Sequence, residues 1–214
     1  MYHQGGLDTY CGFYAILNLV NFLKFKENRS TDFIGAPGFH EKKPFERFSR
    51  FIDAGGFRGF FPERPFGDTG LESQMMKDAL SRALSLFYVR GEVKIEEDLS
   101  QDPYGRPPDA WESYFRPGTE TRFANAEDVL GLTVVQEDHE DDIGHWVVFI
   151  GKNHLEDTAL TCKDGWDGIV LDSERGYEFW KVDKGRILLL TQRNEKVQEI
   201  ATEWIYSFVS LSLS

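Results

Sequence analysis

The chain has 214 residues, of which 41% are hydrophobic and 14% aromatic, a composition that supports a packed core and is unlike that of a disordered protein. Acidic residues outnumber basic ones by 36 to 24, and the resulting net charge of −12 argues against binding to nucleic acid or to an anionic membrane, because both rely on a basic field. The 2 cysteines are too few for the disulfide framework of a small secreted domain and favour a reducing compartment.

The location of the protein is indicated by segments that its sequence lacks. The N-terminus shows no basic region followed by an apolar one, so no secretory signal peptide is expected. The longest apolar run, over residues 13–23, contains two Asn and is too short for a membrane span. We therefore expect a cytoplasmic protein, and a host-directed effector exported by an uncleaved signal would have the same sequence character.

Helices are expected first along the chain. Residues 11–24 carry no charge before Lys24 and are apolar on nearly every face, which predicts a helix buried all round, with Asp8 or Thr9 as its N-cap. A short helix is expected over residues 44–52. A second long helix is expected from about residue 68 to residue 86, where Thr69 and Glu72 form a capping-box pattern.

The rest of the chain is expected to be mainly strands. A strand candidate covers residues 86–93, and a Pro-rich, acidic insertion follows over residues 94–120. Later strands are expected over residues 129–136, 146–151, 159–162, 178–181 and 186–191, and residues 200–213 are expected to form a helix that ends in a strand. Short connections favour antiparallel pairing, so residues 1–214 are predicted to form a single α+β domain.

Cys11 is the first candidate for chemistry. A thiol attacks as the thiolate, and the free N–H groups and dipole at a helix N-terminus favour negative charge at this position. The adjacent Gly12 leaves room for a substrate backbone. Gln4, seven residues earlier, is a neutral side-chain donor that could reach an oxyanion formed on Cys11.

A catalytic thiol also needs a base, and His145 is the best placed of the five histidines. It stands at the first position of an apolar run, HWVVFIG, where a side chain is held rigidly at the mouth of a strand. The remaining four are His3, His40, His139 and His154. If residues 159–163 return as the hairpin partner of this strand, Asp164 lies beside His145 and accepts a hydrogen bond from its ring, with Asp167 as the alternative.

Together these residues resemble a known superfamily. Gln4, Cys11-Gly12 opening a buried helix, Gly144-His145-Trp146 opening a strand, and then Asp164 resemble the papain-like cysteine peptidases, especially compact types such as double-glycine peptidases, Josephin-type deubiquitinases and bacterial effector proteases. The resemblance implies a Cys-bearing helix packed on an antiparallel sheet that bears the His and Asp. It also implies that Gln4 is the oxyanion donor, Cys11 the nucleophile, His145 the base and Asp164 the orienting residue.

The function expected from these residues is hydrolysis of an amide by a cysteine nucleophile. The substrate is expected to be a peptide or isopeptide bond in another protein, for example a ubiquitin-like conjugate, without a cofactor. Two alternatives remain open: a deamidase or acyl/amine transferase with the same triad, and a catalytically silent papain-like module that binds a protein. The sequence does not indicate an oligomeric state.

Other chemistry has little support in the sequence. Cys162 is expected to be a core residue. A zinc site lacks the paired ligand spacing that it needs, and no glycine-rich nucleotide-binding signature is present. The acidic run at residues 137–142, EDHEDD, is expected to be a solvated loop, and its position just before His145 could bias a cleft toward basic substrates.

Overall fold

The structure is a computed structural model that describes residues 11–28, 52–53, 73–98, 126–136, 145–156, 158, 160–173, 176–183, 186–193, 196–202 and 204–214. Within these ranges the helices are α1 (Cys11–Asn28) and α3 (Ser73–Leu86), with short 3-10 helices η3 (Ala126–Asp128) and η4 (Lys152–Leu155). The strands are β1 (Gly91–Asp98), β2 (Leu130–Gln136), β3 (His145–Gly151), β4 (Gly168–Asp172), β5 (Gly176–Asp183), β6 (Arg186–Arg193), β7 (Lys196–Thr202) and β8 (Trp204–Leu213). The chain therefore has an α+β fold, as the sequence predicts.

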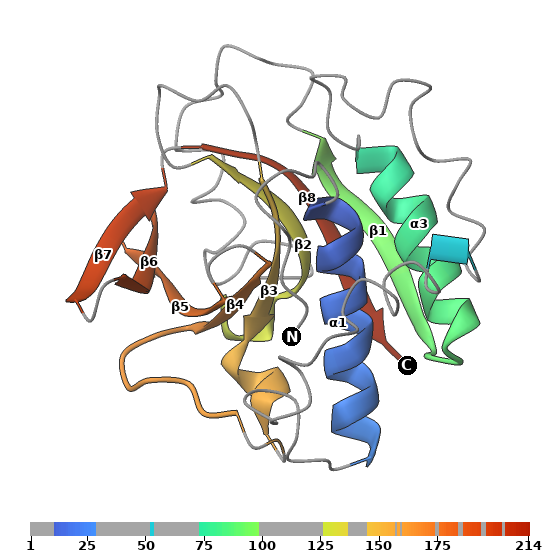
Figure 1. The fold of residues 1–214 in the computed structure, drawn as a ribbon, viewed down its shortest axis with the longest axis horizontal. Helices are drawn as coiled ribbons and strands as arrows, with labels where there is room; N and C mark the ends of the chain where they lie inside the picture. Colours follow the sequence, from blue (N-terminus) through green and yellow to red (C-terminus); the bar gives the residue numbers. More distant parts are fainter. Residues whose placement is uncertain are drawn as a thin grey trace.

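The strands form one antiparallel sheet of 8 strands in the order β1-β8-β2-β3-β4-β5-β6-β7. The last strand, β8, is inserted between β1 and β2, so the end of the chain ties the first strand to the rest of the sheet (Figure 1). Helix α1 packs mainly against β3, and α3 packs against β1 and β8. The N-terminal helices thus cover one part of a sheet that is built mostly from the C-terminal half.

Alternating side chains of the central strands supply cores on both faces of the sheet. Trp146, Val148 and Ile150 of β3 belong to the large core that includes the apolar residues of α1 and α3. Val147 and Phe149 join a smaller core with Trp180, and the Phe149 and Trp180 rings meet edge to face at 4.9 Å. This period of two is the pattern of a strand that is covered on both faces.

The two long helices are confirmed. Helix α1 begins at Cys11 as predicted and continues to Asn28, and α3 ends at Leu86 as predicted. The proposed caps at residues 8, 9 and 69 and most of the helix expected over residues 44–52 lie outside the described residues. Among the described residues, no helix combines the length and the apolar character that a bilayer crossing requires.

Two predicted strands and the start of the predicted insertion need correction. The strand expected over residues 86–93 begins only at Gly91, because the preceding residues close α3 through the hydrogen bond from the Val89 N–H to the Leu84 carbonyl at 2.9 Å. Residues 94–98 therefore belong to β1 and not to the predicted insertion, whose remaining residues lie outside the described ranges. Residues 160–162 of the strand expected over residues 159–162 are not in a strand, and β3 pairs with β2 on one side and with β4 on the other.

The C-terminal segment is a strand and not the predicted helix. Residues 204–213 form β8, and β7 covers residues 196–202. Val209 and Leu211 enter the core beneath the helices, whereas Phe208 enters the core on the other face. The apolar residues of this segment thus alternate between two buried faces, and a run of mainly apolar residues does not by itself distinguish such a strand from a buried helix.

Candidate active site

Three elements bring the candidate site together. Cys11 is the first residue of α1 and is partly buried against the large core. His145 is the first residue of β3, and Asp172 is the last residue of β4. The sequence therefore predicted the helix start and the strand start correctly, whereas the third residue was not foreseen.

His145 is hydrogen-bonded to Asp172. The His145 Nε2 atom lies 3.0 Å from the Asp172 Oδ1 atom, and the side chains are only 17% and 3% exposed. A carboxylate accepts only, so Nε2 carries the hydrogen and donates to it. The other ring nitrogen, Nδ1, is then available to a second partner, and Cys11 lies near enough for its side chain to influence the pKa of His145.

The register of β3 and β4 explains why Asp172 reaches His145. These strands are antiparallel, with Val148 opposite Leu171 and Gly151 opposite Gly168. The end of β4 therefore lies beside the start of β3, and Asp172 follows Leu171 directly. Packing of α1 against β3 brings the helix to the same strand.

The structure does not bring Asp164 to His145. Asp164 is exposed in a turn with Gly165, and this turn precedes Gly168, which pairs with the far end of β3. The prediction assumed that residues 159–163 return along β3, but β4 begins only at Gly168. Because of this later start, Asp172 occupies the place that was expected for Asp164.

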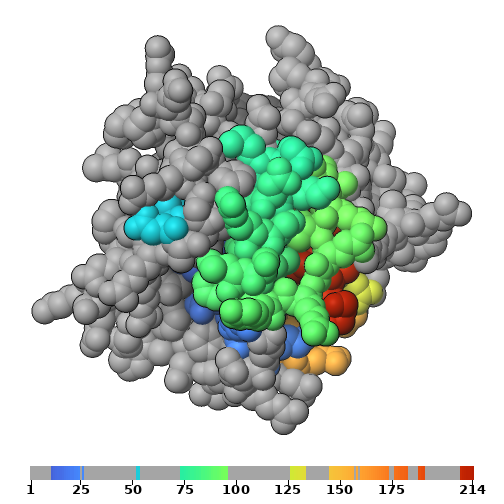
Figure 2. Space-filling model, turned by 90° about the vertical axis from the view of Figure 1, so that its right-hand side faces the viewer, coloured from blue at the N-terminus to red at the C-terminus, as the bar shows by residue number. Residues whose placement is uncertain are grey.

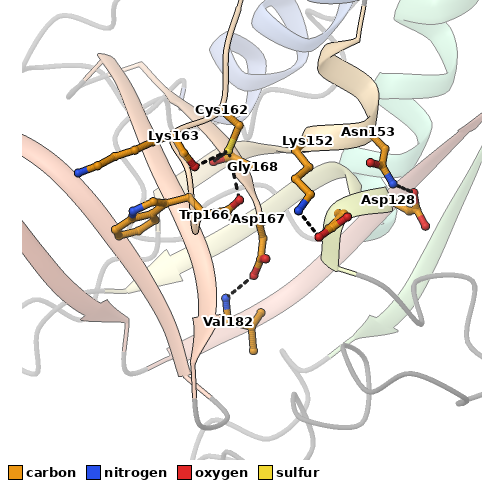
Figure 3. Close-up of polar contacts among 10 residues, drawn as sticks. Asp128, Lys152, Asn153, Cys162, Lys163, Trp166, Asp167, Gly168 and Val182 are labelled. Carbon is orange, nitrogen blue, oxygen red and sulfur yellow. Dashed lines mark hydrogen bonds and ion pairs between the residues drawn. The ribbon is translucent and has the colours of Figure 1, made fainter.

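Asp167, the alternative, has a different task. Its carboxylate accepts a hydrogen bond from the Val182 N–H at 2.8 Å (Figure 3), and its carbonyl accepts one from the Lys152 N–H at 2.8 Å. Its own N–H donates to the Trp180 carbonyl at 2.9 Å. Asp167 therefore links the loop before β4 to β5 and η4, at the end of β3 opposite His145.

A sequence signal for Asp172 existed. It ends the run Gly168-Ile169-Val170-Leu171, all four of which are buried, and it is itself only 2% exposed. A carboxylate at the end of a buried strand needs a polar partner, since an unpaired buried charge is costly. A His that begins one apolar strand and an Asp that ends the next make Asp172 a candidate partner, but this pattern alone does not favour Asp172 over Asp164.

The surroundings of His145 raise its pKa. Burial alone would lower it, but the hydrogen bonds to Asp172 and Cys11 and the charges of these two groups raise the pKa from 6.5 to about 10. The imidazolium form is therefore dominant near neutral pH.

This shift predicts a dependence of stability on pH. Because the folded-state pKa of His145 is raised, its contribution is fully present below about pH 6.5 and is lost as the pH rises to about 10. The Asp172→Asn variant removes the paired charge, so the free energy of unfolding of the wild type should exceed that of the variant most near pH 6. Urea unfolding of both proteins from pH 6 to pH 10 measures the difference, and a difference that grows with pH contradicts the expectation.

Cys162 lies in surroundings that suppress its reactivity. The thiol is partly buried against the large core, in agreement with the predicted core position, and it donates toward backbone carbonyls of Lys163, Trp166 and Gly168 at 3.4–3.6 Å (Figure 3). Burial raises the pKa of this thiol. The fold thus places one cysteine beside a cationic histidine and the other among carbonyl oxygens.

The remaining candidates divide between described and undescribed residues. Gln4 lies outside the described residues, as do His3, His40, His139 and the acidic run at residues 137–142. His154 is hydrogen-bonded through Nε2 to the Asp128 carbonyl at 2.9 Å. It belongs to η4, which follows the end of β3 opposite His145. Within the described ranges, no group of three or more His, Cys, Asp or Glu side chains could hold a metal ion.

Comparison with protein-family models, with curated proteins and with solved structures found no match to this chain.

Proposed function

We propose that this protein is a papain-like cysteine hydrolase that cleaves amide bonds with Cys11, His145 and Asp172. The proposal rests on one observation: the thiol of Cys11, at the N-terminus of α1, lies near a buried, hydrogen-bonded His145–Asp172 pair. A nucleophile, a base that contacts it and a group that orients the base are the parts that thiol-based acyl transfer requires. The order along the chain, with the Cys first and the His next, agrees with the resemblance noted above.

The first half of the reaction forms an acyl-enzyme. The Cys11 thiolate attacks the carbonyl carbon of the substrate, and a C–S bond forms while the carbonyl electrons move to oxygen. The His145 imidazolium then gives its proton to the leaving nitrogen, and the C–N bond breaks as the amine departs. Asp172 holds the ring through Nε2, which leaves Nδ1 free to exchange protons with the reacting atoms.

The second half restores the enzyme. The now neutral His145 takes a proton from water, and the oxygen of this water attacks the thioester carbon. The C–S bond breaks, the carboxylic acid leaves, and the thiolate and imidazolium are regenerated. The oxyanion in both halves needs donors, and we assign this task to the Cys11 N–H, in the first turn where intrahelical acceptors are lacking, and to the Gln4 side chain.

The expected substrate is a peptide or isopeptide bond in another protein, of which a ubiquitin-like conjugate is one example. A nucleophile at the surface end of a core helix, half-buried beside its base, suits a chain that approaches from solvent. Turnover can be tested with a ubiquitin C-terminal fluorogenic amide and a mixture of fluorogenic peptide amides. The Cys11→Ala variant should be inactive, and the Cys162→Ala variant should match the wild type.

A test that needs no substrate compares the two thiols of the same folded protein. At pH 6, iodoacetamide should alkylate Cys11 at least about 10-fold faster than Cys162, because the first is paired with an imidazolium and the second is kept protonated. Peptide mass spectrometry over a time course measures both rates. The proposal fails if both thiols react equally slowly with an ordinary thiol pH profile, or if Cys11→Ala retains full turnover.

A further inference from the structure

Three of the described residues have a positive φ: Tyr88 at 57°, Gly165 at 79° and Gly176 at 97°. The first two are exposed. Tyr88 lies between α3 and β1, which occupy the centre of the face shown in Figure 2, and Gly165 lies in the turn before β4. Gly176 is buried and begins β5. Its φ also exceeds the roughly 50–70° that residues with a Cβ atom adopt in the left-handed region, so this position favours glycine.

Gly176 closes the hairpin that joins β4 to β5. It pairs with Asp172, the last residue of β4, and only residues 173–175 lie between the two. Short hairpin connections of this length are typically completed by a residue with a positive φ, which turns the chain without splaying the strands. Gly176 supplies that φ at the end of the connection. Its backbone conformation therefore helps to set where Asp172 lies.

The backbone of Asp172 is held by β5 and not by the strand that carries His145. The register between β3 and β4 ends at Leu171. The register between β4 and β5 extends one residue farther, to the pair Asp172–Gly176. His145 itself pairs with a residue of β2. The His–Asp hydrogen bond thus joins two side chains beyond the point where the β3–β4 register ends, and β5 supplies the backbone support for Asp172.

The closed end of the hairpin is packed too tightly to absorb a shift. Asp172 and Ser173 are 2% and 1% exposed, and Gly176 is also buried. The Asp172 Oδ1 atom lies 3.0 Å from the His145 Nε2 atom, and a hydrogen bond weakens steeply as its geometry departs from the ideal. Close-packed interiors transmit strain. A tilt of this hairpin would therefore change the His145–Asp172 contact.

We propose that Gly176 is a positioning residue, whose positive φ holds the end of β4 where the Asp172 carboxylate can orient His145. A residue with a Cβ atom at this position would favour a different φ, and the resulting tilt of the hairpin would move Asp172 from the ring. Gly176 acts on the chemistry through Asp172. The consequence for Cys11 rests on the proposed function, whereas the consequence for the His145–Asp172 pair does not.

Gly176→Ala and Gly165→Ala test the proposal as a matched pair, because each adds one methyl group at a positive φ and only the first lies beside Asp172. NMR titration from pH 6 to pH 11 measures the pKa of His145, whose ring signal is identified by its loss in His145→Gln. In Gly176→Ala this pKa should fall from about 10 by roughly 1 or more, because the carboxylate is displaced. In Gly165→Ala it should be unchanged, although both variants should lower the urea midpoint.

Alkylation of Cys11 provides the second readout. At pH 6, Gly176→Ala should slow it roughly 3-fold or more, which is less than removal of the Asp172 carboxylate because the group is displaced and not lost. Gly165→Ala should alkylate at the wild-type rate. In the Asp172→Ala background, Gly176→Ala should change neither this rate nor the pKa of His145 further, because the group that it positions is absent. A purely structural role of Gly176 would add to the effect of Asp172→Ala.

Gly176→Asn is the milder variant, since Asn tolerates a positive φ better than Ala does. Its pKa for His145 should lie between those of the wild type and Gly176→Ala, and it decides the question if Gly176→Ala does not fold. A wild-type pKa of His145 in folded Gly176→Ala or, where only Gly176→Asn folds, in that variant would overturn the proposal. An equal fall in Gly165→Ala or an additive effect in the double variant would also overturn it.

Failure of the proposed function would be recognised separately. In that case the wild-type Cys11 would alkylate as slowly as an ordinary thiol, whereas a lowered pKa of His145 in Gly176→Ala would still support the positioning role.

Discussion

Asp172→Ala is expected to slow the alkylation of Cys11 at pH 6 by about 10-fold or more, and to slow turnover of an amide substrate by roughly 100-fold or more. Without the Asp172 carboxylate, 3.0 Å from its Nε2 atom, His145 loses its orientation. It also loses the hydrogen bond and the charge by which Asp172 raises its pKa. The pKa of His145 should therefore fall toward its ordinary value, and the reactivity that the proposed function assigns to Cys11 should fall with it. Iodoacetamide kinetics with peptide mass spectrometry measure the first effect, and fluorogenic amide turnover measures the second.

Asp164→Ala is the matched control, because it removes the carboxylate that the sequence suggested and the structure places in an exposed turn. It should leave both rates at the wild-type level. Asp172→Asn keeps a hydrogen-bond acceptor without the charge, and it should fall between the wild type and Asp172→Ala if folding is intact by circular dichroism. Wild-type rates in Asp172→Ala, or a loss of rate in Asp164→Ala, would contradict the assigned triad.

Gly168→Ala is expected to lower the free energy of unfolding by about 3 kcal/mol or more. A Cβ atom at this position would lie 2.1 Å from the Ile150 carbonyl oxygen and 2.5 Å from Trp180 Nε1. Both neighbours are fixed, since Ile150 is in the centre of the sheet and the Trp180 ring is fully buried. The β3–β4 pair must separate or shift, and Asp172 shifts with β4.

Urea unfolding measures this loss, with Gly165→Ala as the control. Gly165 has φ = 79° but nothing lies within 4 Å of its ideal Cβ position, so that alanine should cost only about 1 kcal/mol of backbone strain. Because the register of β4 places Asp172, Gly168→Ala should also slow Cys11 alkylation in the folded fraction, and Gly165→Ala should not. Equal stability of the two variants would show that the close approach at Gly168 is not rigid.

Most of the helices and strands could be predicted from the sequence because their patterns are local. The uncharged apolar run from Cys11 to Leu23 and the spacing of apolar residues before Leu86 indicated the two long helices. Of the helix ending in a strand that was predicted for residues 200–213, only the helix was wrong, because β8 is covered on both faces and this hides its alternation. Burial on both faces is a property of the sheet and not of the segment.

The candidate site divides in the same way. Cys11 and His145 could be identified because each stands at the start of an apolar element, where a reactive side chain is held at an edge. Asp172 could not be chosen over Asp164, because that choice depends on which residues pair with β3. The sequence between Gly151 and Gly168 does not show at which residue the loop ends and β4, the next partner of β3, begins.

The sequence by itself determined the α+β class, the two long helices, the strand that begins at His145 and the order of Cys11 and His145 along the chain. These properties follow from composition and from periodicity over a few turns or residues. Only the tertiary structure decided that Asp172 faces His145 and that Cys11 lies near enough to influence the pKa of the same ring. The physical reason is register: the pairing of strands distant in sequence sets which side chains meet, and the local pattern of either strand does not contain that information.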